Sequence, residues 1–265
     1  MRVRKRFGQH FLEPVWVAKV VAAIDPRPDQ TFLEIGPGQG ALTEPLAARA
    51  GRLVAVEIDR DLAADLRRRA IAGVEIVEGD ILTVAVEALS LPHGTRVAGN
   101  LPYNISSPIL ARLAATQSAT GLLHDATLML QREVVDRLVA RPGTGDYGPL
   151  AILLGLAATI ERVLTLPPGA FRPAPKVRSA VVRVVFHPPA RVNALPRALD
   201  SLVRLAFTKR RKTVANALDG SAALPPGWTA PDLLRHAGID GRRRPETLTP
   251  DEWVALARTA ELGSG

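Results

Sequence analysis

Hydrophobic residues recur in short blocks along the first two thirds of the chain, and most blocks end at a glycine or a polar residue. The blocks span residues 31–35, 52–59, 73–80, 95–99, 126–131, 160–166 and 179–186. Their length and their content of Val, Ile and Leu are typical of strands buried in a sheet. Stretches between them have helical spacing, as where Trp16, Val20 and Ile24 share one face. The pattern predicts an α/β fold with a seven-stranded sheet.

Residues 31–43 join the first strand to a turn with three alternate glycines and then to the start of a helix. Gly36, Gly38 and Gly40 lack Cβ atoms, so backbone N–H groups can face a ligand at the helix N-terminus. A glycine-rich turn alone is weak evidence. Glu57 adds to it, because a carboxylate about 20 residues further on can bind both ribose hydroxyls. A nucleoside-binding site is predicted, with NAD, FAD and S-adenosylmethionine all open.

Two further predicted strands lead to Asp80 and Asn100. The Asp80 carboxylate can accept a hydrogen bond from an exocyclic amine such as that of adenine, or it can cap the helical turn that begins at Ile81. Ligand sites in open parallel sheets lie at the carboxyl ends of the strands. We therefore expect four residues at strand ends to share one site: Gly36, Glu57, Asp80 and Asn100.

The predicted chemistry depends on Asn-Leu-Pro-Tyr, residues 100–103. An aromatic exocyclic amine is a poor nucleophile because its lone pair is delocalised into the ring, so an alkylating enzyme must place acceptors around the amine hydrogens. The Asn100 side chain and the Leu101 carbonyl offer two acceptors, and Pro102 keeps Leu101 extended. Tyr103 offers a flat face to a purine pulled from its stack. The alternative for this tetrapeptide alone is a proline turn with a surface tyrosine.

Prolines at positions 188, 189 and 196 interrupt the pattern after the last strand. They predict two domains, residues 1–190 and residues 191–265. The second is predicted to be helical, with helices over 198–218 and 231–237 and a last helix opened by a capping box at Thr249.

Positive charge is concentrated in the second predicted domain. The chain has a formal net charge of +8, and residues 191–265 hold 12 Lys or Arg against 8 Asp or Glu. Two clusters stand out: Lys209, Arg210, Arg211 and Lys212, and then Arg242, Arg243 and Arg244. A solvated helix face is the alternative, but such faces normally mix signs. We predict that both clusters contact phosphates of folded RNA.

Composition narrows the remaining possibilities. The chain has no cysteine, which excludes disulfides and thiolate metal sites and fits a reducing cytosol. No metal site is predicted, and no run approaches the ~20 apolar residues of a membrane-spanning helix. Residues 1–12 combine four cations with Phe7, Phe11 and Leu12, so we expect this segment to dock over another surface rather than to be a solvated tail.

Six motifs follow one another along nearly the whole chain. They are RKRFGQHFL (4–12), EIGPGQG (34–40), NLPYNIS (100–106), LQREVVDRL (130–138), FRPAPKVRS (171–179) and FTKRRKTVANAL (207–218). In these motifs the sequence resembles the small-subunit ribosomal RNA adenine dimethyltransferases of the KsgA/RsmA type. The resemblance implies a Rossmann-like methyltransferase sheet with a small C-terminal helical domain. It also implies methylation of two adjacent adenines, each twice on N6, in a hairpin near the 3′ end of the small-subunit RNA.

The resemblance also implies roles for particular residues. S-adenosylmethionine would be held by His10, Leu12, Gly36, Gly38, Glu57, Asp80 and Asn100. The target adenine would be held by Asn100, Leu101, Pro102, Tyr103 and Phe171. Phe171 would complete an aromatic sandwich with Tyr103, although a Phe among prolines is often only a hydrophobic plug. The sequence departs from the family at His10, which is more often Asn, and at Ala174, which is more often Pro.

The resemblance further implies a cytoplasmic monomer that acts on the assembling 30S subunit. Two alternatives remain open from the sequence. One is a methyltransferase of the macrolide-resistance type, which modifies large-subunit RNA with similar motifs. The other is a non-catalytic ribosome-assembly or transcription factor on the same fold, although a pure binder needs neither the Asn-Leu-Pro-Tyr stretch nor Phe171.

Overall fold

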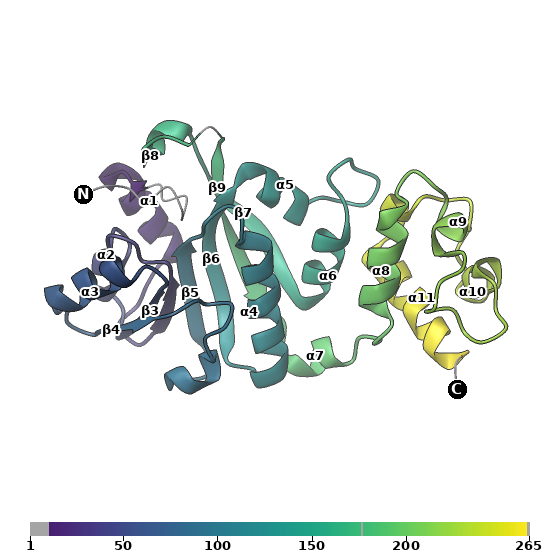
Figure 1. Ribbon diagram of the computed structural model, residues 1–265, viewed down its shortest axis with the longest axis horizontal. Coiled ribbons are helices and arrows are strands. Elements are labelled where there is room, and N and C mark those ends of the chain that lie inside the picture. Colours follow the sequence, from purple (N-terminus) through teal and green to yellow (C-terminus); the bar gives the residue numbers. More distant parts are fainter. Residues whose placement is uncertain (1–10, 176, 264–265) are drawn as a thin grey trace. The chain divides into compact units, whose positions relative to one another are not determined.

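The computed structural model describes residues 11–175 and 177–263 (Figure 1). No helix within these two ranges is long and apolar enough to cross a membrane. His10 and the rest of the basic N-terminal segment before Phe11 lie outside the described residues.

The chain divides into two compact units. One unit comprises Met1–Val135 with Ala158–Pro189, and the other comprises Asp136–Ala157 with Ala190–Gly265. The division near residue 190 agrees with the predicted boundary. Residues 136–157 were predicted to belong to the first domain. In the structure they belong to the second unit and contribute to its core.

The first unit is built on a seven-stranded sheet, as predicted. Its strands, in sheet order, are β4 (Val74–Glu78), β3 (Arg52–Glu57), β2 (Thr31–Ile35), β5 (Thr95–Asn100), β6 (Leu123–Gln131), β9 (Ser179–Phe186) and β7 (Ala158–Leu166). The first five are parallel, and β9 runs antiparallel to both β6 and β7. This is the Rossmann-like methyltransferase arrangement, so the carboxyl ends of β2 to β5 meet at one edge of the sheet.

Burial explains why these segments form the centre of the sheet. Nearly every residue of β2, β3 and β5 is buried, which matches their continuous apolar sequence. The edge strands β4 and β7 include several exposed residues. Helices α1 (Pro14–Ile24), α2 (Thr43–Ala47), α3 (Arg60–Arg69) and α4 (Ser106–Thr120) pack on β7, β3, β4 and β6 respectively. On α1, Val20 and Ile24 are buried and Trp16 is half-buried, as their spacing predicted.

A buried ion pair fastens the base of β5. The Arg96 guanidinium donates to both oxygens of Asp125 on β6, at 2.8 and 2.9 Å, and to the Ile24 carbonyl at the end of α1, at 2.8 Å. Arg183 on β9 binds the same carboxylate at 3.2 Å. Because these charges are paired and hydrogen-bonded, their burial is tolerated, and the network ties three strands and a helix together.

The segment around Phe171 forms a small second sheet. After the 3₁₀ turn η3 (Pro168–Ala170), strand β8 (Phe171–Arg172) pairs antiparallel with β1 (Phe11–Leu12). The Glu13 N–H donates to the Ala170 carbonyl at 2.8 Å and extends the pairing. Sequence periodicity cannot detect a two-residue strand, since its partner lies about 160 residues away.

The second unit is helical. Helix α5 (Arg132–Leu138) crosses the division between the units, and it is followed by α6 (Pro149–Ala157), α7 (Pro189–Asn193), α8 (Leu199–Thr208), α9 (Val214–Leu218), α10 (Ala230–His236) and α11 (Pro250–Leu262). The capping box at Thr249 is confirmed, with Thr249 Oγ1 accepting from the Glu252 N–H and the Glu252 carboxylate accepting from the Thr249 N–H.

The single helix predicted over residues 198–218 is wrong. The chain forms α8, a turn over residues 209–212, and then α9. Thr213 caps α9 by accepting from the Asn216 N–H. Thr is a favoured N-cap residue and a poor helix-interior residue, so it begins a new helix where the prediction continued the old one.

Candidate active site

The Glu57 carboxylate lies at the end of β3 and joins two turns. Its Oε2 accepts from the Gly38 N–H at 2.8 Å, and its Oε1 accepts from the Asp59 N–H at 2.9 Å. The residue is buried, with 4% of its surface exposed. Burial raises the pKa of Glu57, while the two backbone donors act to lower it. The predicted ribose-binding residue therefore also fixes the glycine turn.

The glycine turn has the backbone conformation that its sequence predicted. Gly36, Gly38 and Gly40 have φ angles of 66°, 58° and 84°, a region that favours glycine. A Cβ atom on Gly40 would lie 2.9 Å from Leu66 Cδ2 of α3, so the turn packs tightly there. At Gly36 the same position is open, with no atom within 4 Å. The turn thus has one packed side and one side with room for a ligand.

Asp59 is a site-forming residue that the sequence analysis missed. It is buried, and its Oδ1 accepts from the N–H groups of Asp61 and Leu62 at 3.0 and 3.3 Å, which caps α3. The signal was present, since Asp is a favoured N-cap two residues after a strand end. This cap fixes the direction in which the chain leaves Glu57.

Asp80 lies just beyond β4, which ends at Glu78 rather than at the predicted residue 80. Its Oδ1 accepts from the Leu82 N–H at 2.9 Å, so the local capping alternative describes this oxygen correctly. A carboxylate has lone pairs on both oxygens, and Asp80 is only half-buried. The local bond leaves acceptor capacity for a ligand amine.

The Asn-Leu-Pro-Tyr stretch begins at the last residue of β5. Leu101 is buried and its N–H donates to the Met129 carbonyl at 3.1 Å, which continues the pairing with β6 beyond the strand. The Ile105 N–H then closes a turn on the Pro102 carbonyl at 3.2 Å. Asn100, Pro102 and Tyr103 are half-buried, so the turn presents them at the edge of the sheet.

The Tyr103 hydroxyl is held by Ser179, the first residue of β9. The two oxygens are 2.7 Å apart, and Ser179 is buried. Burial raises the pKa of Tyr103, and the bond with Ser179 acts in the opposite direction. Ser179 is a second residue that the sequence analysis missed, although it ends the FRPAPKVRS motif. Its bond fixes the tilt of the Tyr103 ring.

Phe171 is placed differently from the predicted aromatic sandwich. Its side chain is 2% exposed and belongs to the hydrophobic core of the first unit, together with Leu12, Val20 and Ile24. In this structure the ring is therefore the hydrophobic plug that was the alternative reading. Leu12 and Phe171, predicted to contact cofactor and base respectively, are register partners on β1 and β8.

Glu34 is a buried carboxylate near Glu57 that the sequence analysis did not assign a role. It lies on β2 and is 1% exposed, and among the described residues its Oε2 has no hydrogen-bond partner. Burial raises the pKa of Glu34 to about 8, the nearby Thr43 hydroxyl opposes this rise, and the Glu57 carboxylate adds to it. Negative charge on Glu57 therefore favours the protonated form of Glu34.

The two predicted basic clusters meet in the second unit. The N–H groups of Val214 and Ala215, at the start of α9, donate to the carbonyls of Arg243 and Gly241 at 2.7 and 3.2 Å. Residues 209–212 immediately precede this junction. The backbone of residues 241–243 therefore lies beside the start of α9, next to the turn that carries the first cluster.

Not every arginine of these clusters is free to bind RNA. Arg243 donates to both oxygens of Glu252 and to the Thr247 carbonyl, so it fastens α11 rather than facing solvent. Arg210 donates to the Gly145 carbonyl at 2.6 Å. By contrast, four side chains are exposed: Lys209, Arg211, Lys212 and Arg244.

Comparison with known proteins identifies the family of this chain. Residues 1–260 match the family described as ribosomal RNA adenine dimethylase. The chain belongs to the ribosomal RNA adenine dimethylase family. It is 46% identical over 258 residues to "Ribosomal RNA small subunit methyltransferase A" of Aromatoleum aromaticum, covering 96% of this chain and 93% of that protein. The protein of the same name from Verminephrobacter eiseniae is 43% identical over 98% of this chain and 90% of its own length.

Solved structures of dimethylases and related methyltransferases share the fold. A dimethyladenosine transferase from Plasmodium falciparum superposes with a TM-score of 0.82 at 24% identity, covering 96% of this chain and 98% of that chain. The 23S rRNA methyltransferase ErmE superposes with a TM-score of 0.66 at 28% identity, covering 95% and 99%. As a member of this family, the chain is a methyltransferase. Within residues 11–175 and 177–263 no group of three His, Cys, Asp or Glu side chains is placed to hold a metal ion.

The buried carboxyl group of Glu34 predicts a pH dependence of stability. Its pKa is raised from 4.5 to about 8 in the folded chain, so the folded state binds more protons than the unfolded state across that pH window. The free energy of unfolding should therefore fall as pH rises through the window, by up to about 1.4 kcal/mol per pH unit from this group. Urea unfolding at mildly acidic and mildly alkaline pH should show a smaller decline in Glu34→Gln than in wild type.

Glu87→Gln is the matched control, because Glu87 is exposed and lies outside the site. The control should decline with pH as wild type does. If Glu34→Gln and wild type lose the same free energy between the two pH values, Glu34 is not the buried proton-binding group described here.

Proposed function

We propose that this protein transfers methyl groups from S-adenosylmethionine to N6 of two adjacent adenines in a 3′-terminal hairpin of small-subunit ribosomal RNA, giving N6,N6-dimethyladenosine. The observation that carries the proposal is the meeting of the glycine turn, Glu57, Asp80 and the Asn-Leu-Pro-Tyr turn at one edge of the parallel sheet. Membership of the dimethylase family and the names of the curated relatives support it.

The residues at this edge fit the cofactor. The open side of Gly36 leaves space against the backbone, and each Glu57 oxygen, although it accepts one backbone N–H, keeps a lone pair for a ribose hydroxyl. Asp80 retains an acceptor for the adenine amine. Leu12 belongs to the hydrophobic core of the first unit. His10 and Gly38 complete the proposed set. When bound, S-adenosylmethionine supplies an electrophilic methyl group on a positively charged sulfur.

The chain's own contribution to the reaction is orientation and hydrogen bonding. The Asn100 side-chain oxygen and the Leu101 carbonyl accept from the amine hydrogens of the target adenine and draw its lone pair out of conjugation. The proline turn fixes the direction of these acceptors, since Leu101 is buried and hydrogen-bonded to Met129. Tyr103, oriented by Ser179, supplies the face on which the base stacks. These groups align the amine with the methyl donor. The free-energy cost of that alignment is a large part of the barrier to alkyl transfer.

Phe171 can contribute a second aromatic face only if its ring leaves the core, because it is almost fully buried. Its backbone lies on the short β8 strand beside β1, so a small shift of that two-stranded sheet is the movement required. We therefore assign the stacking role in the first instance to Tyr103.

The exposed cations of the second unit are proposed to contact the RNA backbone. Lys209, Arg211, Lys212 and Arg244 extend into solvent, and Arg242 is exposed although it pairs with Asp240. Arg210 and Arg243 support this surface through their internal bonds. We propose that the partner is the assembling 30S subunit and that the protein acts as a monomer in the cytoplasm.

A second candidate activity is methylation of large-subunit RNA. The superposition on the 23S rRNA methyltransferase ErmE over 95% of the chain is the observation that supports this second activity. Mass mapping of modified adenines in both ribosomal subunits distinguishes the two activities. A non-catalytic role is disfavoured by the ordered Asn-Leu-Pro-Tyr turn and its Tyr103–Ser179 bond, since binding alone requires neither.

The primary test is incubation of the purified protein with labelled S-adenosylmethionine and unmethylated small subunits. We expect label in N6,N6-dimethyladenosine at two adjacent positions near the 3′ end. Label confined to large-subunit RNA would favour the second candidate, and no transfer to either subunit would contradict the proposed activity.

Glu57→Ala should weaken binding of S-adenosylmethionine and of its demethylated product to a similar extent, because the two share the ribose. Loss of charged hydrogen bonds worth roughly 1.5–3 kcal/mol predicts about a ten- to hundredfold change. Calorimetry measures both ligands, with Glu75→Ala on the neighbouring strand as a control. Unchanged affinity in Glu57→Ala would rule out ribose binding by this residue.

Asn100 and Tyr103 should show different defects in single-turnover methylation. The proposed Asn100 interaction strengthens as the amine lone pair leaves conjugation, so Asn100→Ala should mainly lower the rate. Tyr103→Ala should lose roughly 1–3 kcal/mol of stacking. Tyr103→Phe should be much milder, since it keeps the ring and loses only the bond to Ser179.

Binding of the small subunit should be retained in all three variants. If Tyr103→Phe is as inactive as Tyr103→Ala, the hydroxyl rather than the ring face is essential. A wild-type rate in Asn100→Ala would show that its side chain does not activate the amine.

Replacement of Lys209, Arg211 and Lys212 by Gln should weaken RNA binding and flatten its salt dependence. Each lost phosphate contact should lower the slope of log affinity against log salt by roughly 0.7–0.9. Arg210 is left in place because it holds the Gly145 carbonyl. Cofactor affinity should not change, and an unaltered salt slope would show that these cations only solvate the surface.

A further inference from the structure

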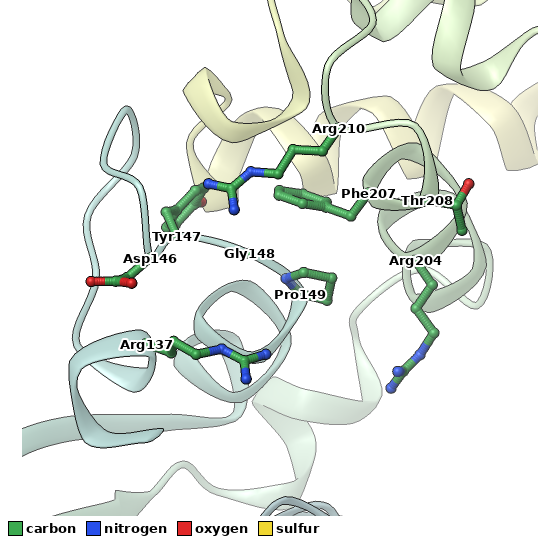
Figure 2. Close-up of a pocket in the computed structure, with 9 residues that line it drawn as sticks. All are labelled: Arg137, Asp146, Tyr147, Gly148, Pro149, Arg204, Phe207, Thr208 and Arg210. Carbon is green, nitrogen blue, oxygen red and sulfur yellow. The ribbon is translucent and has the colours of Figure 1, made fainter. Parts of the chain in front are cut away.

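A cavity of about 410 Å³ lies within the second unit, apart from the proposed methyl-transfer site (Figure 2). Three arginines line it, from different parts of the chain: Arg137 on α5, Arg204 on α8 and Arg210 on the turn after α8. Phe207 contributes an aromatic ring. The volume falls within the range of about 300–1,000 Å³ that is usual for small-molecule sites.

The arginines differ in how far they are already engaged. Arg210 is committed, since it donates to the Gly145 carbonyl at 2.6 Å. Arg204 uses Nε to bind Asp200 at 2.8 Å, which leaves its two terminal nitrogens with donor capacity. Arg137 is exposed and has no polar partner among the described residues. Two guanidinium groups that line the cavity therefore keep donors for an anion.

The Phe207 ring is half-buried and lines the cavity. It packs on the buried Trp253, with the ring centroids 6.1 Å apart. Gly148 lies beside the ring, and a Cβ atom there would come within 3.7 Å of it. A larger side chain at this position would cover the ring, so glycine leaves it accessible from the cavity.

The negative charge of Asp146 sets an orientation. Asp146 lines the cavity, and Figure 2 shows it at the opposite end from Arg204. An anionic group is repelled from Asp146 and attracted to Arg204 at the other end, and Figure 2 shows Arg137 on the same side as Asp146. A ligand with a phosphate at one end and a flat ring next to it fits this distribution of charge.

We propose that this cavity holds one unpaired nucleotide of the RNA substrate, with its phosphate on Arg137 and Arg204 and its base on Phe207. The proposal rests on the proposed function, which supplies the RNA. A base within a duplex has both faces covered by its neighbours, so only an unpaired or extruded nucleotide can offer a face to Phe207. The cavity would thus read a single-stranded feature of the RNA at a place separate from the target adenine.

The test compares two labelled RNAs bound to the full-length protein over a series of salt concentrations. One is a single-stranded oligoribonucleotide roughly eight nucleotides long, within the site sizes of single-strand binding grooves. The other is a blunt RNA duplex in which each strand has the same number of phosphates as that oligoribonucleotide. The variants are Phe207→Leu, Phe207→Tyr and the double change Arg137→Gln with Arg204→Gln.

The two kinds of variant should differ in a diagnostic way. Phe207→Leu should weaken binding of the single strand by roughly fivefold or more without a change in salt slope, because it removes stacking and no charge. The double arginine variant should lower the single-strand slope by roughly 0.7, because the two arginines share one phosphate. Phe207→Tyr should bind as wild type does. Duplex binding should be little affected by either Phe207 change.

A matched control removes the same charge elsewhere in the second unit. Arg197 and Arg258 are exposed and lie outside this cavity, so their double change to Gln should have a smaller effect on the single strand. An equal effect of the control, or a loss of duplex binding in Phe207→Leu equal to its loss of single-strand binding, would overturn the proposal. Wild-type binding by Phe207→Leu would also overturn it. If Phe207→Leu fails to fold, the exposed arginine pair still decides the outcome.

Failure of this proposal is distinguishable from failure of the proposed function. Wild-type protein that methylates small subunits, together with Phe207→Leu that binds the single strand normally, refutes only the nucleotide cavity. Wild-type protein that methylates no ribosomal RNA refutes the proposed function, whatever the oligonucleotides show.

Discussion

The hydrogen bonds of one buried carboxylate hold the candidate site together. Glu57 ends β3 and accepts one backbone N–H from the glycine turn after β2 and another from the turn that leads into α3. The Gly36 N–H also donates to the Val56 carbonyl at 2.9 Å, and Arg69 of α3 donates to the Gln39 carbonyl at 2.8 Å, so further bonds tie the glycine turn to β3 and α3. The parallel register of β2 with β3 places both strand ends at one level, where Glu57 joins the two turns.

The same edge of the sheet concentrates buried acidic groups at an energetic cost. Glu34 and Glu57 are both almost fully buried, and burial raises the pKa of each. Glu34 Oε2 has no hydrogen-bond partner among the described residues, so nothing there offsets the cost of burying that oxygen as a charge.

The second unit is assembled from segments that are far apart in the sequence. Residues 136–157 join residues 190–265, and Tyr147 donates its hydroxyl to the Leu248 carbonyl at 3.0 Å across about 100 residues. Arg243 binds Glu252, and the carbonyls of Arg243 and Gly241 accept from N–H groups at the start of α9. Some arginines of a basic sequence thus hold the unit together, whereas Arg211 and Arg244 are exposed.

The sequence by itself determined the strands, the glycine turn and the order of residues at the strand ends, because apolar runs, positive φ angles and N-caps are local properties. It also identified the family through motifs such as Asn-Leu-Pro-Tyr. Only the tertiary structure decided that Phe171 is buried on a two-residue strand, that Arg243 is used internally and that Thr213 divides a predicted helix. Phe171 depends on a partner strand about 160 residues away, Arg243 on the Glu252 carboxylate nine residues away, and Thr213 on competition between a local cap and a continuing helix. Periodicity resolves none of these.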